Sequence, residues 1–376
     1  MLNVAVIFGG KACEHDISII TGVQVVNNLD TNKYNVVPIY IDKVGNWYLL
    51  PSNISIEDVL AYDSLGRRCS ILPNDKFLYC YKFGRMKRQM QIDVVVVSMH
   101  GLNGEDGSVA ALMQLNCITT INCPMLCSAI CLDKVAFKKY LAGVNGVSSL
   151  PSFSVIEGDD VSEIDKKIVK SFGYPVILKP SNLGSSIGIA VCNSYIELQS
   201  KLPQVYAFDK SVLVEKKLNN FKEYNIAVVK FRDQYVLSGI EEPIASNQIL
   251  TYSDKYLTNN KAVGMANLTR KFPAKVKAAV KKKIERWALL LYQNLHMRGV
   301  VRLDYLYDVD TNQLYINEAN TIPGSFANYL FQDLSFSQLL NGCIDNAIFE
   351  NQSDNTVKYF ESSVLSNVGN YNKFIK

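Results

Sequence analysis

Four polar side chains near the C-terminal end of the chain have the residue types of a magnesium site. Arg302 and Asp304 stand two residues apart in one stretch, and Glu318 and Asn320 stand two apart in the next. Side chains alternate between the faces of a strand, so the members of each pair share a face. Carboxylate and amide oxygens suit Mg²⁺, which takes one or two carboxylates and completes its shell with water and substrate phosphates.

A β-hairpin would bring the two pairs together. β-Branched and aromatic residues are frequent at 300–307 and again at 314–320. A cluster of turn formers lies between these two stretches, at residues 308–312. If the hairpin is centred on Thr311, Asp304 lies opposite Glu318 and Arg302 lies opposite Asn320. The alternative interpretation is a solvated face of mixed charge. The carboxylates stand inside apolar strands, and a turn at residues 320–324 offers backbone amides, which favours a site.

A second set of candidates lies in a loop of small residues at 179–188. Lys179 ends one predicted strand there, and glycine and serine then lead into another. Unhindered backbone amides and hydroxyls of this kind can surround polyphosphate while lysines supply charge. The chain contains no GxxxxGK[ST] motif, and no GxGxxG motif follows a strand, so this loop differs from the common nucleotide loops.

Two further strand ends carry polar residues. Glu14 follows the strand 4–8 and a Gly-Gly turn and stands near the start of a helix over 14–27. A carboxylate there is favoured by the helix dipole, but the carboxyl end of a strand is also where open α/β sheets bind ligands. Three glycines surround His100, Glu105 and Asp106 after the next buried strand, and a ligand loop and a plain polar turn are equally compatible with them.

The elements that position these residues begin with a parallel sheet. Residues 93–98 are continuously β-branched at their centre, which is typical of a strand buried on both faces. Residues 34–41 are a further strand and residues 108–115 a helix, whereas residues 46–88 suggest only peripheral structure with strands near Trp47 and Phe77.

The remaining chain predicts a second set of strands and helices. One helix is expected over 126–142, with Lys134 inside its apolar face. Strands are expected at 151–156, 176–178, 189–192 and 211–216, and helices at 161–172, 273–296 and 336–349. Residues 223–231 and 234–240 alternate apolar and polar side chains, which indicates antiparallel strands of a separate, mixed sheet.

Two polar segments complete the chain. The stretch from Tyr252 to Arg270 has the length and composition of a lid. The tail from Glu350 onward is rich in asparagine and is expected to pack loosely.

Composition limits the classes of protein. The 376 residues include 39 Lys and Arg against 35 Asp and Glu, with no long basic tract, so nucleic acid is not a favoured partner. No stretch has the length to span a bilayer and no signal peptide is evident, which indicates a cytoplasmic protein without a membrane partner. Nine cysteines are then expected as thiols, with Cys123, Cys127 and Cys131 as small core residues rather than a metal site.

With these motifs in order, the chain resembles the ATP-grasp superfamily and, within it, the D-alanine–D-alanine ligases. The motifs are FGGKACEH from Phe8, HGLNGEDG from His100, KPSNLGSSIG from Lys179, YSDKY from Tyr252, RLD from Arg302 and NEANTIPG from Asn317. The resemblance implies an ATP-grasp fold of α/β and α+β class with an N-terminal parallel α/β domain. It implies four segments, namely an N-terminal domain (1–122), a central ATP-grasp subdomain (123–217), a C-terminal ATP-grasp subdomain with the lid (218–350) and a tail (351–376).

The resemblance also implies a mechanism and a role for each motif. A carboxylate attacks the γ-phosphate of ATP, and the amine of a second amino acid then displaces phosphate from the acyl phosphate. The implied ligands of Mg²⁺ are Asp304, Glu318 and Asn320. Two metal ions are expected, and Mn²⁺ could replace Mg²⁺. The implied ATP ligands are Lys134, Lys179 and Lys255 at the phosphates, Glu215, Lys216 and Leu218 at adenine, and Glu223 at ribose. The implied catalytic residues are Glu14 at the first ammonium, Ser185 and Tyr256 beside it, and Arg302 with the Gly324 amide at the oxyanion.

One departure leaves the second substrate open. Lys255 and Tyr256 in the lid favour an amine acceptor over D-lactate, but Tyr329-Leu330 stands where family members have a Ser-Leu pair that binds the second carboxylate. The partners implied are small amino acids and a second copy of the chain as a homodimer. The main interpretation is a D-alanine–D-alanine ligase that makes cell-wall dipeptide. One alternative is a ligase whose second substrate is D-serine or another amino acid. The other alternative is a nucleotide-binding regulator without turnover.

Overall fold

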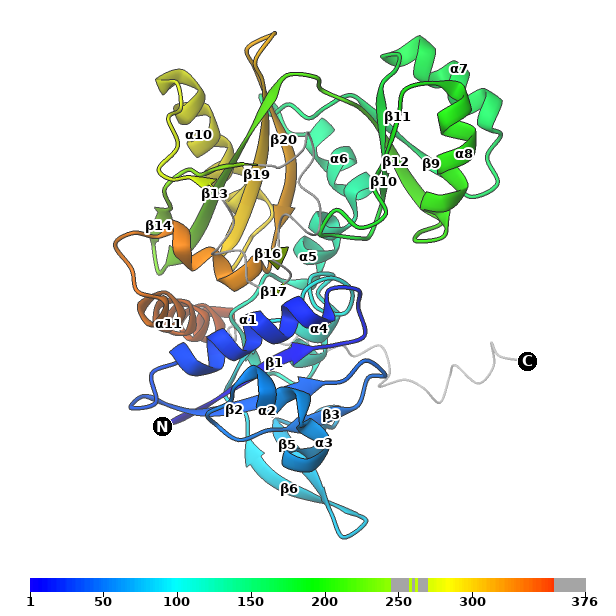
Figure 1. The fold of residues 1–376 in the computed structure, drawn as a ribbon. Helices are drawn as coiled ribbons and strands as arrows, with labels where there is room; N and C mark the ends of the chain where they lie inside the picture. The colour runs from blue at the N-terminus through cyan, green and yellow to red at the C-terminus, as the bar shows by residue number, and fades with distance from the viewer. Residues whose placement is uncertain (245–256, 259–260, 263–269, 355–376) are drawn as a thin grey trace, which may run out of the picture.

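Three main sheets and the helices that cover them form the protein (Figure 1). The structure is a computed structural model that describes residues 1–244, 257–258, 261–262 and 270–354. Within these residues no helix is long and apolar enough to cross a membrane.

The first sheet has eight strands in the order β6-β5-β4-β3-β2-β1-β7-β8. Strands β2, β1, β7 and β8 run parallel, and the others extend the sheet by antiparallel pairing. Their bounds are β1 Leu2–Gly9, β2 Tyr34–Ile41, β3 Trp47–Leu49, β4 Arg67–Ile71, β5 Phe77–Lys82, β6 Arg85–Gln91, β7 Val94–Val97 and β8 Thr119–Thr120. The valines of β7 are buried, as their continuous β-branched run predicts.

Helices cover this sheet and include one from the far end of the chain. The helix α1 (His15–Asn28) packs on β1, α4 (Ser108–Leu115) packs on β7, and α11 (Phe336–Asp354) packs on β8 and α1. The predicted helix at 108–115 is confirmed. The segment 46–88 is more regular than expected, because β3 to β6 and the short helices α2 (Ile56–Leu60) and α3 (Tyr62–Leu65) lie within it.

The second sheet is antiparallel, in the order β11-β10-β12-β9. Its bounds are β9 Ser152–Ile156, β10 Val176–Pro180, β11 Ala190–Cys192 and β12 Ser211–Lys216. The helices α7 (Val161–Ser171) and α8 (Tyr195–Tyr206) bury their apolar side chains against it, including Ile168 and Leu202. Helix α8 was not predicted from the sequence.

The third sheet carries the predicted hairpin, in the order β14-β13-β19-β20. Its bounds are β13 Phe221–Phe231, β14 Gln234–Leu237, β19 Val301–Asp308 and β20 Gln313–Asn320. The expectation of a separate sheet is confirmed, but this sheet is antiparallel throughout and not mixed. Helix α10 (Ala278–Asn294) packs on β13 and begins later than the predicted residue 273.

The single helix expected over 126–142 is wrong. The chain forms α5 (Met125–Leu132) and α6 (Lys134–Ala142), and Asp133 between them is extended, with φ −74° and ψ 107°. The Asp133 side chain accepts a hydrogen bond of 2.8 Å from the Ala136 amide, so it caps α6. Cys127 and Cys131 of α5 are buried in the core of the third sheet, as expected.

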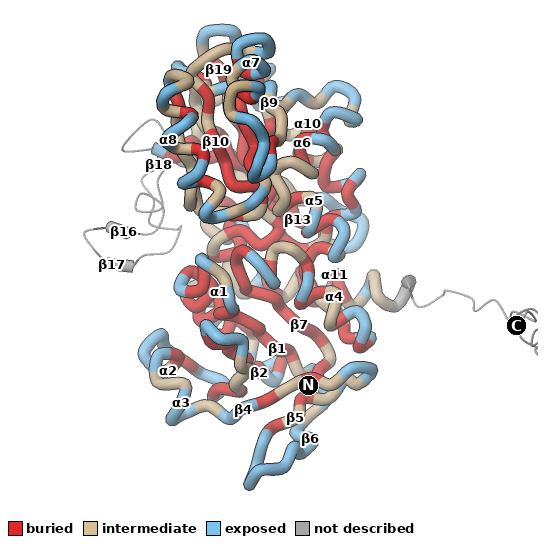
Figure 2. The backbone as a smooth tube through the Cα atoms, turned by 90° about the vertical axis from the view of Figure 1, so that its right-hand side faces the viewer, coloured by how far each residue is buried: buried red, intermediate tan, exposed pale blue. Residues whose placement is uncertain are grey.

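The segment after residue 349 is better packed than expected where the structure describes it. Helix α11 continues to Asp354, and the Glu350 carboxylate lies 3.0 Å from both the Lys230 and Arg298 nitrogens. Burial is concentrated in the strands of the sheets, whereas the β5–β6 hairpin is largely exposed (Figure 2). Each of the first three predicted domains contains one of the three main sheets, and the domain boundaries themselves stay a prediction.

Candidate active site

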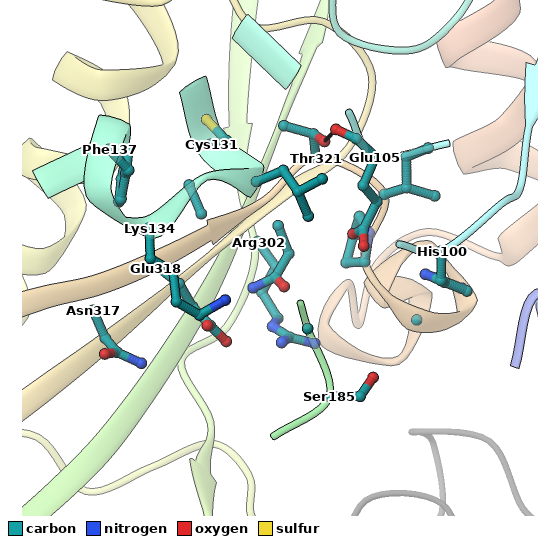
Figure 3. Close-up of a pocket in the computed structure, with 17 residues that line it drawn as sticks. His100, Glu105, Cys131, Lys134, Phe137, Ser185, Arg302, Asn317, Glu318 and Thr321 are labelled. Atoms are coloured by element: carbon teal, nitrogen blue, oxygen red, sulfur yellow. Dashed lines mark hydrogen bonds between the residues drawn. The ribbon is translucent and has the colours of Figure 1, made fainter. Parts of the chain in front are cut away.

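A pocket opens where elements of all three sheets meet (Figure 3). The loop after β7, the start of α6, the β10–β11 loop and the β19–β20 hairpin each contribute to its wall. Its lining includes six residues that the sequence singled out as site candidates, namely Lys134, Ser185, Arg302, Glu318, Asn320 and Gly324.

The hairpin brings the predicted metal residues together in the expected register. Asp304 pairs with Glu318 and Arg302 with Asn320. Arg302 donates two hydrogen bonds of 2.7 Å to Asp304, from Nε to Oδ1 and from Nη2 to Oδ2, and Asn320 Nδ2 donates to Oδ2 at 3.0 Å. The Asp304 charge, ahead of other groups, opposes the effect of burial and keeps the pKa of Arg302 well above its usual value.

A β-bulge at Asn317 interrupts the alternation of side chains along β20. Tyr305 pairs with Ile316 directly after the Asp304–Glu318 pair, so Asn317 is the extra residue. Ile316 and Ala319 both belong to the hydrophobic core although they are three positions apart. Asn317, Glu318 and Asn320 all line the pocket, and Ala319 belongs both to the pocket wall and to the core.

The donor set of this hairpin fits a hard divalent cation. Asp304, Glu318 and Asn320 supply carboxylate and amide oxygens, with no sulfur or imidazole among them. Asp304 already binds Arg302 and Asn320, so a metal ion would share that carboxylate or replace one of the contacts. The arrangement can therefore hold Mg²⁺ next to a guanidinium group.

Lys134 stands at the wall of the pocket rather than inside a long helix. It is the first residue of α6, and its Nζ donates to the Leu183 carbonyl at 2.5 Å. Asp133 accepts a second hydrogen bond, of 2.8 Å, from the Ser181 hydroxyl. These contacts fasten the β10–β11 loop, which carries Ser185 in a left-handed conformation with φ 54°, to the start of the helix.

Lys179 belongs to a buried group of charges. Its Nζ pairs with the Glu215 carboxylate and lies 3.3 Å from the Asn317 oxygen. Glu215 also pairs with Lys138 at 2.6 Å, a residue that the sequence analysis did not single out. The spacing of Lys134 and Lys138, four apart on one helix face, is the signal that could have identified it.

The other predicted adenosine residues lie at or just after the end of β12 and on β13. Lys216 ends β12 and is exposed, Leu218 follows it and is buried, and Glu223 is on β13. Lys255 and Tyr256 lie outside the described residues.

Glu14 connects the first sheet to the β10–β11 loop. It directly precedes α1 without a side-chain cap hydrogen bond to that helix, its side chain is buried, and its Oε1 accepts a hydrogen bond of 3.2 Å from the Gly184 amide. Burial raises the pKa of the Glu14 carboxyl. Among the described residues its Oε2 has no hydrogen-bond partner, so a buried acceptor is available for a donor.

The loop after β7, for which the sequence left a ligand role and a plain turn open, lines the pocket through His100 and Glu105. His100 Nε2 lies 2.8 Å from the Thr21 hydroxyl, and burial lowers the pKa of His100 to about 4. Burial, followed by the charges of Glu14 and Glu318, raises the pKa of Glu105 to about 8. At neutral pH the His100 ring is therefore uncharged, and the Glu105 carboxyl is largely protonated.

Tyr329 occupies the position at which the resemblance leads us to expect the serine of a Ser-Leu pair. Its ring stacks on Arg270, with the guanidinium carbon 4.0 Å from the ring centre, and Arg270 pairs with the buried Glu241 at 2.9 Å. The Tyr329 hydroxyl is buried and has no hydrogen-bond partner among the described residues. Tyr329 is thus a buried phenol near Arg302, with which it interacts electrostatically.

The family models that match this sequence cover most of it. The model described as D-ala D-ala ligase N-terminus matches residues 3–123, and the one described as D-ala D-ala ligase C-terminus matches residues 145–338. The chain belongs to the D-alanine–D-alanine ligase family. Relatives named D-alanine–D-alanine ligase come from Caldicellulosiruptor bescii, 34% identical over 95% of this chain and 98% of that protein, and from Thermosipho melanesiensis, 33% identical over 97% and 98%.

Solved structures show the same ATP-grasp architecture for this member of the family. The D-alanine–D-alanine ligase of Coxiella burnetii superposes with a TM-score of 0.79 at 24% identity, over 94% of this chain and 96% of that one. The VanG D-Ala:D-Ser ligase of Enterococcus faecalis superposes with a TM-score of 0.78 at 28% identity, over 92% and 99%. The predicted fold class is therefore confirmed.

Proposed function

We propose that this chain is an ATP- and Mg²⁺-dependent ligase that joins two molecules of D-alanine through an acyl phosphate. The observation that carries the proposal is that Arg302, Glu318 and Asn320 line one pocket together with Lys134. Asp304 lies directly behind them, hydrogen-bonded to Arg302 and Asn320 and paired with Glu318. Membership of the family supports D-alanine as both substrates. The product would be a cell-wall precursor, made in the cytoplasm by a homodimer.

In the first step a substrate carboxylate must approach a triphosphate that repels it. Asp304, Glu318 and Asn320 would hold Mg²⁺, which supplies positive charge at the transferring phosphoryl group. Lys134 and Lys179 stand at the edges of the same site and would neutralise the remaining phosphate oxygens. Lys255 would complete the set of cations at the γ-phosphate.

In the second step an amine attacks the acyl phosphate and a negatively charged oxygen develops. Arg302 is buried, and its charge is oriented by Asp304, so it would need little rearrangement to stabilise that oxygen together with the Gly324 amide. Glu14 would accept hydrogen bonds from the ammonium group of the first substrate through its unpartnered Oε2, with Ser185 and Tyr256 beside it.

A second candidate function follows from Tyr329. The phenol stands where family members have a small hydroxyl, and the 28% identical VanG protein is described as a D-Ala:D-Ser ligase. A D-serine or other amino-acid acceptor would therefore retain the same first half-reaction and change only the second pocket.

Phosphate release from ATP, measured with D- and L-amino acids singly and in pairs and combined with product mass, tests the proposal. Phosphate release with D-alanine alone and a dialanine product is the expected result. A mixed dipeptide would move the assignment to the second candidate. Absence of release with every pair, in a protein that still binds nucleotide, would leave the non-catalytic regulator.

A further inference from the structure

Lys138 is a buried lysine for which the proposed reaction has no use. It lies one helical turn beyond Lys134 on α6, and its side chain is 8% exposed. In the described part of the chain, the Glu215 carboxylate is the one anion within ion-pair distance of its Nζ, at 2.6 Å. Removing a charged lysine from water is unfavourable unless an anion pairs with it, so the burial of this ion pair requires an explanation.

Glu215, the partner of Lys138, also forms an ion pair with a second lysine. The side chain of Glu215 is fully buried, and its second oxygen pairs with Lys179. One carboxylate thus faces two ammonium groups, one on α6 and one on β10. The two lysines differ, because Lys179 also contacts Asn317 at the pocket wall, whereas the ion pair of Lys138 is with Glu215.

That difference becomes meaningful if Lys179 changes partner, which is the step that rests on the proposed function. When Lys179 turns to a bound nucleotide, Glu215 loses one of its two cations. Without Lys138 the carboxylate would then be an unpaired charge in a buried position, which is strongly unfavourable. With Lys138 in place it remains paired throughout.

We propose that Lys138 is a positioning residue of the nucleotide site, whose 2.6 Å ion pair with Glu215 allows Lys179 to leave that carboxylate for the nucleotide. Lys138 acts through Glu215 and does not touch the nucleotide. Its loss is expected to weaken nucleotide binding while the use of the amino acid is unchanged.

The test is calorimetric binding of the magnesium complex of a non-hydrolysable ATP analogue to the full chain. Lys138→Met should raise the Kd about tenfold or more, and Lys138→Arg should restore it to near the wild-type value. Lys139→Met is the matched control, because Lys139 is the next residue of α6 and is exposed. The KM for D-alanine should not change in any of the three.

A second comparison removes the carboxylate as well and also covers the case in which Lys138→Met does not fold. Because Lys138 acts through Glu215, adding Lys138→Met to Glu215→Gln should leave the Kd of the Glu215→Gln protein unchanged. A further loss in the double variant would mean that Lys138 contacts the nucleotide directly, which overturns the proposal.

Proton uptake separates this role from a merely structural one. The charged groups that face Glu215 are Lys138 on α6 and Lys179 on β10, and Glu318 on β20 acts on Lys138. In Lys138→Met, nucleotide binding should cause Glu215 to take up a proton, which is measured as a binding heat that depends on the buffer. The wild type should show no such uptake by this group.

Two outcomes distinguish this inference from the proposed function. Binding by Lys138→Met with the wild-type Kd would overturn the inference alone. A wild-type chain that binds no nucleotide would overturn the proposed function with it.

Discussion

The Glu14 carboxylate accepts a hydrogen bond of 3.2 Å from the Gly184 amide, a residue 170 positions away in the sequence. The start of α1 is thereby tied to the β10–β11 loop, and the second carboxylate oxygen remains for a ligand. The contact thus joins the first two sheets at the point where the substrate ammonium would bind.

Glu14→Gln should keep the contact to Gly184 and remove the charge. Hydrogen bonds to charged groups contribute about 1.5–3 kcal/mol, so we expect the KM for the amino acid to rise about 10- to 100-fold with little change in melting temperature. Asp16→Asn, at an exposed carboxylate in the same helix, is the control. Steady-state kinetics with an unchanged KM in Glu14→Gln would show that the ammonium binds elsewhere.

Glu318→Gln should abolish turnover, because it removes one of the two carboxylate charges offered to the metal. The amide has the same size and still lines the pocket, so the melting temperature should stay within a few degrees of the wild type. Phosphate release at saturating Mg²⁺ is the measurement, with Glu163→Gln on the exposed face of α7 as the control. Full activity in Glu318→Gln would mean that the metal site is wrongly assigned.

Arg302→Lys should lower kcat about 10²- to 10³-fold, the usual loss when one oxyanion donor is removed. Lysine keeps the charge but cannot make the two parallel hydrogen bonds to Asp304, so its ammonium group will not be held in place. Pre-steady-state phosphate release should show the larger effect on the second step. Arg286→Lys, at an exposed position on α10, should behave as the wild type.

His100 should make stability depend on pH on the acid side. Its pKa of about 4 in the folded protein lies below the unfolded value of 6.5, so the unfolded chain takes up the proton first as the pH falls. Its contribution, of about 3 kcal/mol, is present above pH 6.5 and lost as the pH falls towards 4. Melting temperatures between pH 7 and pH 4 should fall less in His100→Gln than in the wild type, whereas His296→Gln, at an exposed position, should follow the wild type.

Tyr329 should determine acceptor choice. Tyr329→Phe keeps the ring on Arg270 and removes a hydroxyl that has no partner among the described residues, so stability should not fall. If that hydroxyl binds the acceptor carboxylate, the KM for the acceptor should rise about two- to tenfold. Tyr329→Ser should shift product mass towards dialanine if the wild type prefers another acceptor. Identical acceptor kinetics in all three proteins would exclude this role.

The sequence was sufficient where chemistry and periodicity coincide. The hairpin register at Asp304 and Glu318 followed from alternation and from the turn formers alone, and it is confirmed. The valines of β7 likewise identified a buried parallel strand. What the sequence did not show depends on tertiary contacts. The helix break at Asp133 arises because its carboxylate binds both the Ala136 amide and the Ser181 hydroxyl, and Ser181 is distant in sequence.

Charge pairs across elements were hidden for the same reason. Lys138 and Glu215 are separated by three strands and two helices along the chain, and no local pattern predicts that they meet. The roles of Lys255 and Tyr256 stay predictions, since these residues lie outside the described part of the chain. The site roles of the remaining candidates stay predictions as well, although their positions are now known.

The extra residue in β20 lets Ile316 and Ala319 share one face of the strand although they are three positions apart. With Asn317 removed, strict alternation would run unbroken from Leu314 and would still place Ile316 and Ala319 inside and Glu318 and Asn320 on the opposite face. A strand without this residue would therefore keep its acid and its amide facing the pocket. It would lose the side-chain oxygen that lies 3.3 Å from the Lys179 ammonium group.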